Sequence, residues 1–138
     1  MNTKAVPIKW GPTLERLVVK LNPFCGIVAI KKEIDDGTMQ AWEVFAEHIS
    51  LGCFLTRIDN RYDGDKDLAL LFTVREDNVR EPITGVMYRL LEEIAREGKI
   101  KYIRIHVPSP ALARIVENAG FNFLESVFIK EVSHDDKK

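Results

Sequence analysis

The stretch that decides the fold class is residues 68–107, LALLFTVREDNVREPITGVMYRLLEEIAREGKIKYIRIHV. Leu68–Val74 is a continuous apolar run rich in strand-forming residues, which predicts a strand buried on both faces. Thr84–Glu97 has apolar residues at three- and four-residue spacing, which predicts an amphipathic helix, and Gly98 lies where a left-handed C-terminal cap is expected. Tyr102–Val107 alternates apolar and polar residues, which predicts a second strand. This order predicts two parallel neighbouring strands joined by a right-handed crossover.

The chain beyond this stretch continues the alternation of helix and strand. Ser109 followed by Pro110 is a typical helix start, and the helix that they begin is expected to end at Gly120. Phe121–Val132 is strand-like, and its apolar side chains suggest an edge or patch that a homodimer or another protein partner could cover. The tail Ser133–Lys138 is too polar to pack, so we expect it to be flexible.

The N-terminal half gives more ambiguous signals. Leu14–Leu21 and Gly26–Ile30 are apolar runs that fit a helix or a strand. Asp36–Ser50 carries apolar residues at helical spacing, which predicts a helix capped by Asp36 or Thr38.

A hairpin is expected between the two halves. Gly52–Asp59 predicts a strand, and the turn-forming pair Asp63–Gly64 favours a hairpin back into Leu68–Val74. With a flexible start at Met1–Lys4, the chain is expected to form a single domain over residues 1–138. The predicted fold class is α/β (α+β): a mixed β-sheet with helices on both faces and a central parallel β-α-β unit.

The composition limits the classes of function. The chain has 138 residues, of which 46% are hydrophobic and 30% are charged, and its 20 Lys and Arg nearly balance its 21 Asp and Glu. The formal net charge of −1 argues against binding nucleic acid or a membrane through bulk charge. Cys25 and Cys53 lack metal-ligand spacing, and no apolar run approaches the roughly 20 residues that span a bilayer. We therefore expect a cytoplasmic protein without a metal site.

The link from the strand ending at Val74 to the helix starting near Thr84 predicts an anion site. The first N–H groups of a helix have no partners within the helix, and the helix dipole adds partial positive charge there. A phosphate or pyrophosphate group is the expected guest. Every parallel strand–helix crossover presents such an end, so the surrounding residues must decide whether it is used.

Those residues resemble the GNAT superfamily, the acetyl-CoA-dependent N-acetyltransferases. Arg80 and Gly85 occupy the first and last positions of the family's loop, Arg/Gln-x-x-Gly-x-Gly/Ala, in the sequence REPITG. Val86–Gly98 (VMYRLLEEIAREG) resembles the family's following helix, and Ala113–Phe121 (ARIVENAGF) resembles its closing helix with the Gly-Phe end. Two family residues are replaced: Ile83 stands at the middle loop glycine, and Val116 stands at the tyrosine that protonates the coenzyme thiolate in many members.

The resemblance implies where acetyl-CoA would bind. Its pantetheine arm would pair with the backbone beyond Val74, where the two parallel strands separate. Its pyrophosphate would lie on the amides of the loop and helix start, with Arg80 as its charge partner. The residues expected to contact the pyrophosphate through their backbone are Ile83, Thr84, Gly85 and Val86.

The resemblance also implies a direct transfer to an amine. Glu76 lies just past the strand end, which is the usual place for the base that takes the amine's proton or for its water relay. His106, near the end of the neighbouring strand, is a second candidate acid or base. The acceptor would be an amine on a small molecule or a protein.

Two hypotheses remain open from the sequence. The first is an acyl-CoA-dependent N-acyltransferase that acts on an unknown amine. The second is a catalytically inert protein of the GNAT fold with a binding or structural role, of the kind found among bacteriophage accessory and virion proteins. The replacements at Ile83 and Val116 favour the second, and the spacing of the loop and helices favours the first.

Overall fold

The structure is a computed structural model, and it describes residues 2–21, 26–79, 84–106, 110–118, 120–122 and 130. The chain divides into two compact units, Met1–His106 and Val107–Lys138. Helix α4 (Pro110–Asn118) belongs to the second unit. The expected single domain over residues 1–138 stays a prediction. Among the described residues, no helix is both long enough and apolar enough to cross a membrane.

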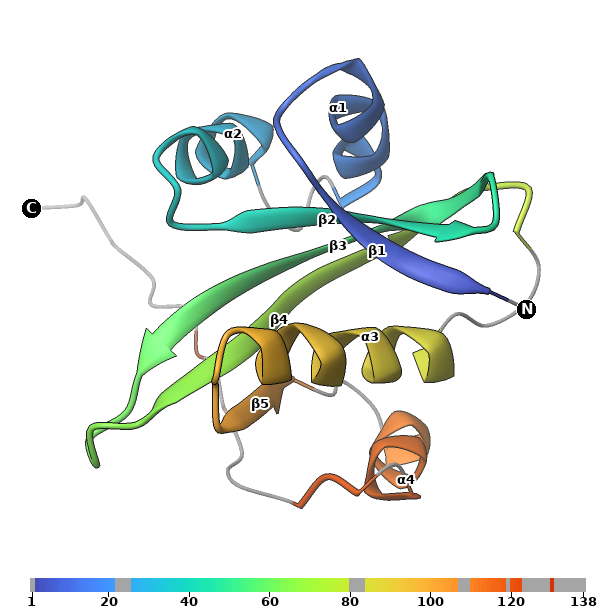
Figure 1. Cartoon of the computed structure of the whole chain (residues 1–138). Helices are drawn as coiled ribbons and strands as arrows, with labels where there is room; N and C mark the ends of the chain where they lie inside the picture. Colours follow the sequence, from blue (N-terminus) through green and yellow to red (C-terminus); the bar gives the residue numbers. More distant parts are fainter. Residues whose placement is uncertain are drawn as a thin grey trace, which may run out of the picture. The chain divides into compact units, whose positions relative to one another are not determined.

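The described part of the first unit is built on a five-stranded sheet in the order β1-β2-β3-β4-β5 (Figure 1). The first four strands are antiparallel neighbours, whereas β4 and β5 are parallel. The parallel pair confirms the prediction for the central β-α-β unit. The strands are β1 (Thr3–Ile8), β2 (Gln40–Ala46), β3 (Ile49–Asn60), β4 (Lys66–Arg75) and β5 (Tyr102–Ile105).

Helices cover both faces of this sheet, as the sequence predicts. Helix α1 (Pro12–Val18), the short 3-10 helix η1 (Val19–Leu21) and helix α2 (Ile27–Asp35) lie on one face, and helix α3 (Thr84–Glu97) lies on the other (Figure 1). The core beneath α1 and α2 is formed by buried apolar side chains from both helices, the segment that follows α2, and three strands: Leu14, Leu17, Val18, Ile30, Met39, Ala41, Cys53, Leu55 and Val74.

The elements around the central crossover agree closely with the sequence. Helix α3 has the predicted bounds, Thr84–Glu97. The β3–β4 hairpin is confirmed, and Gly64 has a φ of +87° in its turn. The predicted cap of α3 is displaced by one residue, because the left-handed residue is Lys99, with φ +55°, rather than Gly98.

The predicted helix over Asp36–Ser50 is wrong. This segment contains β2, a tight turn and the start of β3, and Asp36 is the C-terminal cap of α2 rather than an N-terminal cap. Strand β2 has apolar side chains on both faces: Ala41 and Val44 are buried, and Trp42 stacks on Phe54. Apolar residues on both faces hide the two-residue alternation of a strand, so helical spacing arises by coincidence.

The remaining N-terminal elements extend the prediction. Both ambiguous apolar runs are helical, in α1 with η1 and in α2. Thr3 and Lys4 belong to β1, where the sequence predicts a flexible end. In the second unit α4 begins at Pro110 as predicted, and Gly120 follows it with φ +96°. Ser109 and nearly all of the predicted strand Phe121–Val132 lie outside the described residues.

Candidate functional site

The end of β4 extends beyond its parallel neighbour. Strands β4 and β5 pair from Asp67 opposite Tyr102 to Leu70 opposite Ile105, and β4 then continues to Arg75. The register between β3 and β4 shifts at the same place, because Leu55 pairs with Phe72 and the next residue of β3 pairs with Leu70. Within the described residues, the last five residues of β4 therefore have an edge that β5 does not cover. We call residues 71–75 on this side the open edge.

The backbone of the open edge presents hydrogen-bond donors. The N–H of Glu76 donates to the carbonyl of Leu51 on β3, at 3.0 Å. Successive strand residues direct their backbone groups to alternate edges, so the N–H groups of Thr73 and Arg75 are directed away from β3, toward the open edge. An extended chain with amide groups is the natural partner of such an edge.

The N-terminus of α3 lies beside the open edge. The hydroxyl of Thr73 donates to Sδ of Met87, the fourth residue of α3, at 3.2 Å. No acidic side chain lies in the first turn of α3. The first N–H groups of a helix have no partners within the helix, so these groups and the helix dipole favour an anion at the start of α3.

The predicted coenzyme-binding residues divide into three groups. Thr84, Gly85 and Val86 are the first three residues of α3, as the prediction needs. The side chain of Val74 is buried against α1 and its backbone groups face β3, so its neighbours Thr73 and Arg75 present backbone groups at the open edge instead. Arg80 and Ile83 lie outside the described residues.

Glu76 lies just past β4 in a bidentate ion pair with Arg16 of α1. Nη1 and Nη2 of Arg16 donate to the two carboxylate oxygens at 2.7 and 2.9 Å. The hydrogen bonds and charge of Arg16 lower the pKa of Glu76, although partial burial opposes them. Glu76 is therefore held as a carboxylate, and its intrinsic basicity is weakened. Its role as the base stays a prediction.

A second ion pair lies next to the first. Nζ of Lys20, in η1, contacts Asp77 at 2.8 Å and donates to the carbonyl of Arg75 at 3.2 Å. Together Arg16, Lys20, Glu76 and Asp77 form what we call the charge clasp, which ties the α1–η1 segment to the end of β4.

The charge clasp makes a pH-dependent contribution to stability that can be measured. Because the folded pKa of Glu76 is lowered, its stabilisation is fully present above the ordinary glutamate pKa of about 4.3 and is lost as pH falls through the folded value. We expect Arg16→Gln to lower the urea midpoint at about pH 7 and to lower it less at a pH below the folded pKa of Glu76, where the carboxylate is protonated in both proteins. An equal loss at both pH values would contradict this assignment.

His106 is not brought close to Glu76. It is exposed and directly follows Ile105, which pairs with Leu70. Glu76 is five strand positions beyond the residue level with His106, which corresponds to about 16 Å along the strand. The two predicted proton-transfer residues therefore do not form one cluster, and a role for His106 stays a prediction.

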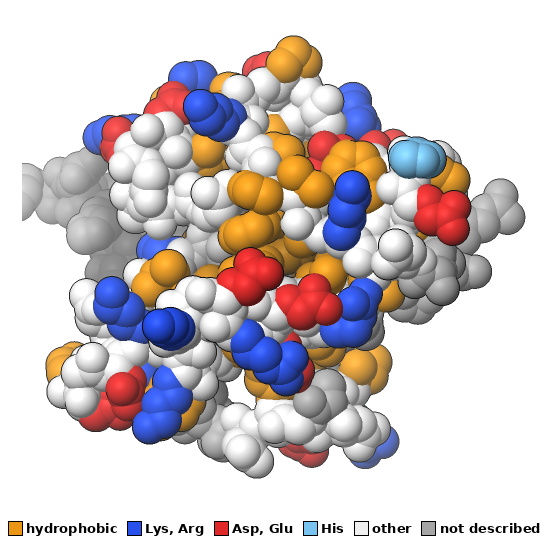
Figure 2. Space-filling model, viewed as in Figure 1, with side chains coloured by type: hydrophobic (Ala, Val, Ile, Leu, Met, Phe, Trp, Pro, Cys, Tyr) orange, Lys and Arg blue, Asp and Glu red, His pale blue; other side chains and the backbone are white. Residues whose placement is uncertain are grey.

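Other reactive side chains add little to the site. Burial raises the pKa of the Cys53 thiol to about 12, so this cysteine is not a thiolate nucleophile near neutral pH. No cluster of metal-ligating side chains occurs in the part of the chain that the structure describes. Figure 2 shows Lys and Arg interspersed with Asp and Glu on the face in view, without a large area of one sign.

Arg16 is the residue of this site that the sequence prediction missed. Its spacing from Lys20 places two basic side chains on one helical face, which is the only local signal. The partner carboxylate lies 60 positions away in the sequence, so the pair becomes visible only in the folded chain.

Solved structures with a similar fold include acetyltransferases. AAC(6')-Iy, in complex with the bisubstrate analogue CoA-S-monomethyl-acetylneamine, superimposes with a TM-score of 0.70 at 14% identity, covering 97% of this chain and 100% of that one. The chain has the GNAT fold. The ribosomal-protein-alanine N-acetyltransferase of Brucella melitensis gives a TM-score of 0.69 at 11% identity, with 95% of this chain and 100% of that chain covered. Glucosamine-6-phosphate N-acetyltransferase of Arabidopsis thaliana gives 0.66 at 11% identity, with 96% and 100% covered.

The GNAT fold confirms the fold that the sequence resemblance implied. The shared architecture extends over nearly the whole length of the chain, far beyond the segment that carries the loop motif. No family model matches the sequence, and no curated protein matches it.

Proposed function

We propose that the protein is an acyl-CoA-dependent N-acyltransferase that transfers an acetyl group directly to a primary amine. The observation that carries this proposal is the open edge of β4 beside the N-terminus of α3, within a GNAT fold. Acetyl-CoA has two parts that fit these two features. Its amide-containing arm can pair with a strand edge, and its pyrophosphate can bind at a helix start.

In this proposal acetyl-CoA binds along the open edge as a substrate. The amides of its pantetheine arm pair with the backbone at Thr73 and Arg75, and its pyrophosphate lies on the first-turn amides of α3. By the family resemblance, Arg80 and Ile83, which precede α3 in the sequence, are expected to complete the proposed pyrophosphate site. The absence of acidic side chains from the first turn of α3 fits such a guest.

The acceptor then approaches from the α1 face. Its ammonium loses a proton to the Glu76 carboxylate or to a water beside it, and the neutral amine attacks the thioester carbonyl carbon. The C–N bond forms, the C–S bond breaks, and the departing sulfur takes the second proton of the amine. His106 is retained as a secondary candidate acid or base.

Acetyl-CoA is expected to raise the melting temperature of the protein. A ligand at one hundred times its Kd adds about 2.7 kcal/mol to the free energy of unfolding. Differential scanning fluorimetry and calorimetry with acetyl-CoA and free CoA measure this effect. No shift at millimolar coenzyme would eliminate the proposed function.

A variant of α3 tests the location of the coenzyme. Gly85→Glu places negative charge and bulk in the first turn of α3. It should raise the apparent Kd for acetyl-CoA about tenfold or more and so reduce the coenzyme-induced rise in melting temperature. The matched control is Arg96→Glu, which adds the same residue in the last turn of α3, where the side chain is exposed. The control should keep the shift. Equal rises in melting temperature in both variants would show that the pyrophosphate does not bind at the start of α3.

Turnover is tested on a panel of amines. The solved neighbours named above suggest three types: neamine, glucosamine 6-phosphate and a peptide with N-terminal alanine. Release of the free CoA thiol reports transfer to each amine.

A second candidate is a GNAT-fold protein that binds without transferring an acetyl group. Val116, in α4, is buried and cannot donate a proton at the position where the family resemblance places a tyrosine. Coenzyme binding without turnover on any amine would favour this candidate. A role as a phage accessory or virion protein, a homodimer or protein partner, and a cytoplasmic location stay predictions.

A further inference from the structure

The carboxylate at the end of β4 is fixed in orientation by a residue from another element. Two parallel N–H···O bonds from Arg16, at 2.7 and 2.9 Å, engage both oxygens of Glu76. Such a bidentate pair fixes the plane of a carboxylate as well as its position. The Glu76 side chain is only 14% exposed, whereas that of Arg16 is 54% exposed, so the arginine reaches inward from the surface of α1.

This carboxylate lies on the face of β4 opposite α3. Val74, two residues before Glu76, packs in the core beneath α1, and the Glu76 side chain joins α1 through Arg16. Thr73, on the alternate face, contacts Met87 of α3. The coenzyme proposed at the α3 side and an acceptor near Glu76 would therefore meet at the open edge from opposite faces.

The pair leaves capacity for an acceptor. An ionised carboxylate offers about four lone-pair positions on its two oxygens, and the guanidinium of Arg16 uses two of them. No other described side chain donates a hydrogen bond to these oxygens, so one position on each is left for an ammonium or a bridging water. Building on the proposed acyl transfer, we propose that Arg16 is a positioning residue, which holds the Glu76 carboxylate in one orientation on the acceptor side of the open edge.

The charged groups around Glu76 come from three elements. Arg16 and Lys20 stabilise the carboxylate, whereas Asp77 opposes it. Glu43 of β2 acts on Arg16 and further favours the charged guanidinium. The net effect is a lowered pKa of Glu76, so the carboxylate stays ionised at pH values at which an unpaired glutamate begins to protonate.

The test compares two variants of basic residues that form ion pairs. Arg16→Gln removes the bidentate partner of Glu76, and the matched control Lys31→Gln removes an exposed ion pair within α2, between Lys31 and Asp35. With acetyl-CoA and the most active amine of the panel, Arg16→Gln should lower kcat about tenfold or more, because a displaced catalytic group reacts poorly. KM for acetyl-CoA should stay unchanged, and Lys31→Gln should behave as wild type.

Two further readouts separate positioning from a general structural effect. The acidic limb of the kcat profile should move to higher pH in Arg16→Gln but not in Lys31→Gln, and carboxyl-detected NMR titration should show the same rise in the pKa of Glu76. Arg16→Lys restores the charge without the second hydrogen bond, so its kcat should lie between those of wild type and Arg16→Gln.

The outcomes are distinct. If Glu76→Gln is impaired while Arg16→Gln keeps wild-type kcat and pH profile, the positioning role is wrong. If both variants keep full activity, Glu76 takes no part in the chemistry and the inference is equally overturned. If the wild-type protein neither binds acetyl-CoA nor transfers its acetyl group, the proposed function itself is wrong. Measurements on the wild-type protein alone show this, without any Arg16 variant.

Discussion

Replacing Gly52 by alanine is expected to lower the free energy of unfolding by about 3 kcal/mol, since it combines overpacking with backbone strain. Gly52 has a φ of +137°, which side-chain-bearing residues rarely adopt. A Cβ built on it would lie 2.1 Å from the carbonyl oxygen of Val74 and 2.9 Å from Cα of Arg75. Both contacts are with backbone, which cannot rotate away as a side-chain end would, so β3 and β4 must separate.

Gly64→Ala is the matched control for this prediction. Gly64 also has a positive φ, +87°, but no atom lies within 4 Å of the Cβ position. Gly64→Ala should therefore lower the free energy of unfolding by about 1 kcal/mol, which is the cost of the backbone conformation alone. Urea denaturation followed by the fluorescence of Trp10 and Trp42, both in the first unit, measures the difference. Equal losses in the two variants would mean that the contact with β4 contributes nothing.

Gly52→Ala is also expected to affect coenzyme binding. Gly52 lies against Val74 and Arg75, at the end of the open edge, so any separation of β3 from β4 moves the backbone of these two residues. Under the proposed function, Gly52→Ala should weaken acetyl-CoA binding as well as stability.

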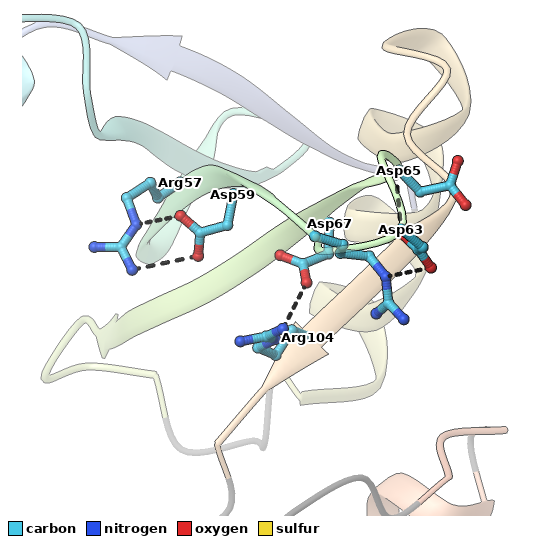
Figure 3. Close-up of polar contacts among 7 residues, drawn as sticks. Arg57, Asp59, Asp63, Asp65, Asp67 and Arg104 are labelled. Atoms are coloured by element: carbon cyan, nitrogen blue, oxygen red, sulfur yellow. Dashed lines mark hydrogen bonds and ion pairs between the residues drawn. The ribbon is translucent and has the colours of Figure 1, made fainter.

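Replacing Arg104 by methionine is expected to cost about 3 kcal/mol of stability, because it leaves a buried carboxylate without its cation. The partner, Asp67, is 1% exposed and lies 3.0 Å from Nη2 of Arg104 (Figure 3). Asp67 also pairs across the sheet with Asp59, another carboxylate, which carries its own arginine, Arg57. Two facing aspartates repel each other, so each arginine offsets part of that repulsion.

The Arg57–Asp59 pair provides the control. Its side chains are partly exposed, so Arg57→Met should change stability by only about 0.5 kcal/mol. Adding Asp67→Asn to Arg104→Met removes the stranded charge and should recover part of the lost stability. If the double variant is no more stable than Arg104→Met, the loss comes from packing of the arginine stem and not from the carboxylate.

The sequence alone predicts an element correctly where the local residue pattern and the tertiary packing favour the same conformation. The strand over Leu68–Val74 and helix α3 were predicted because a continuous apolar run and a 3.6-residue period are distinct signals. The helix predicted over Asp36–Ser50 is wrong because β2 has apolar side chains on both faces, with Trp42 and Val44 on one and Ala41 and Phe45 on the other. The tertiary contacts of the sheet, rather than local spacing, determine the conformation there.

The candidate site was predicted only in part for a related reason. The helix start at Thr84 and the carboxylate of Glu76 follow from local order along the chain. The partner of Glu76 does not, because Arg16 lies on a helix that the sequence left ambiguous. The local sequence pattern also does not predict the length of the open edge, because this length depends on where the short β5 stops pairing with β4.

Thr73 of β4 and Glu76, just past the end of β4, lie on opposite faces of the sheet, and this placement has a kinetic consequence. Two molecules that approach β4 from opposite faces do not need to pass through the same entrance. Under the proposed chemistry, the acceptor could exchange while the coenzyme stays in place, and the reacting atoms would meet within a ternary complex. No relay through an acylated side chain is then required, which agrees with the shielded and unreactive thiol of Cys53.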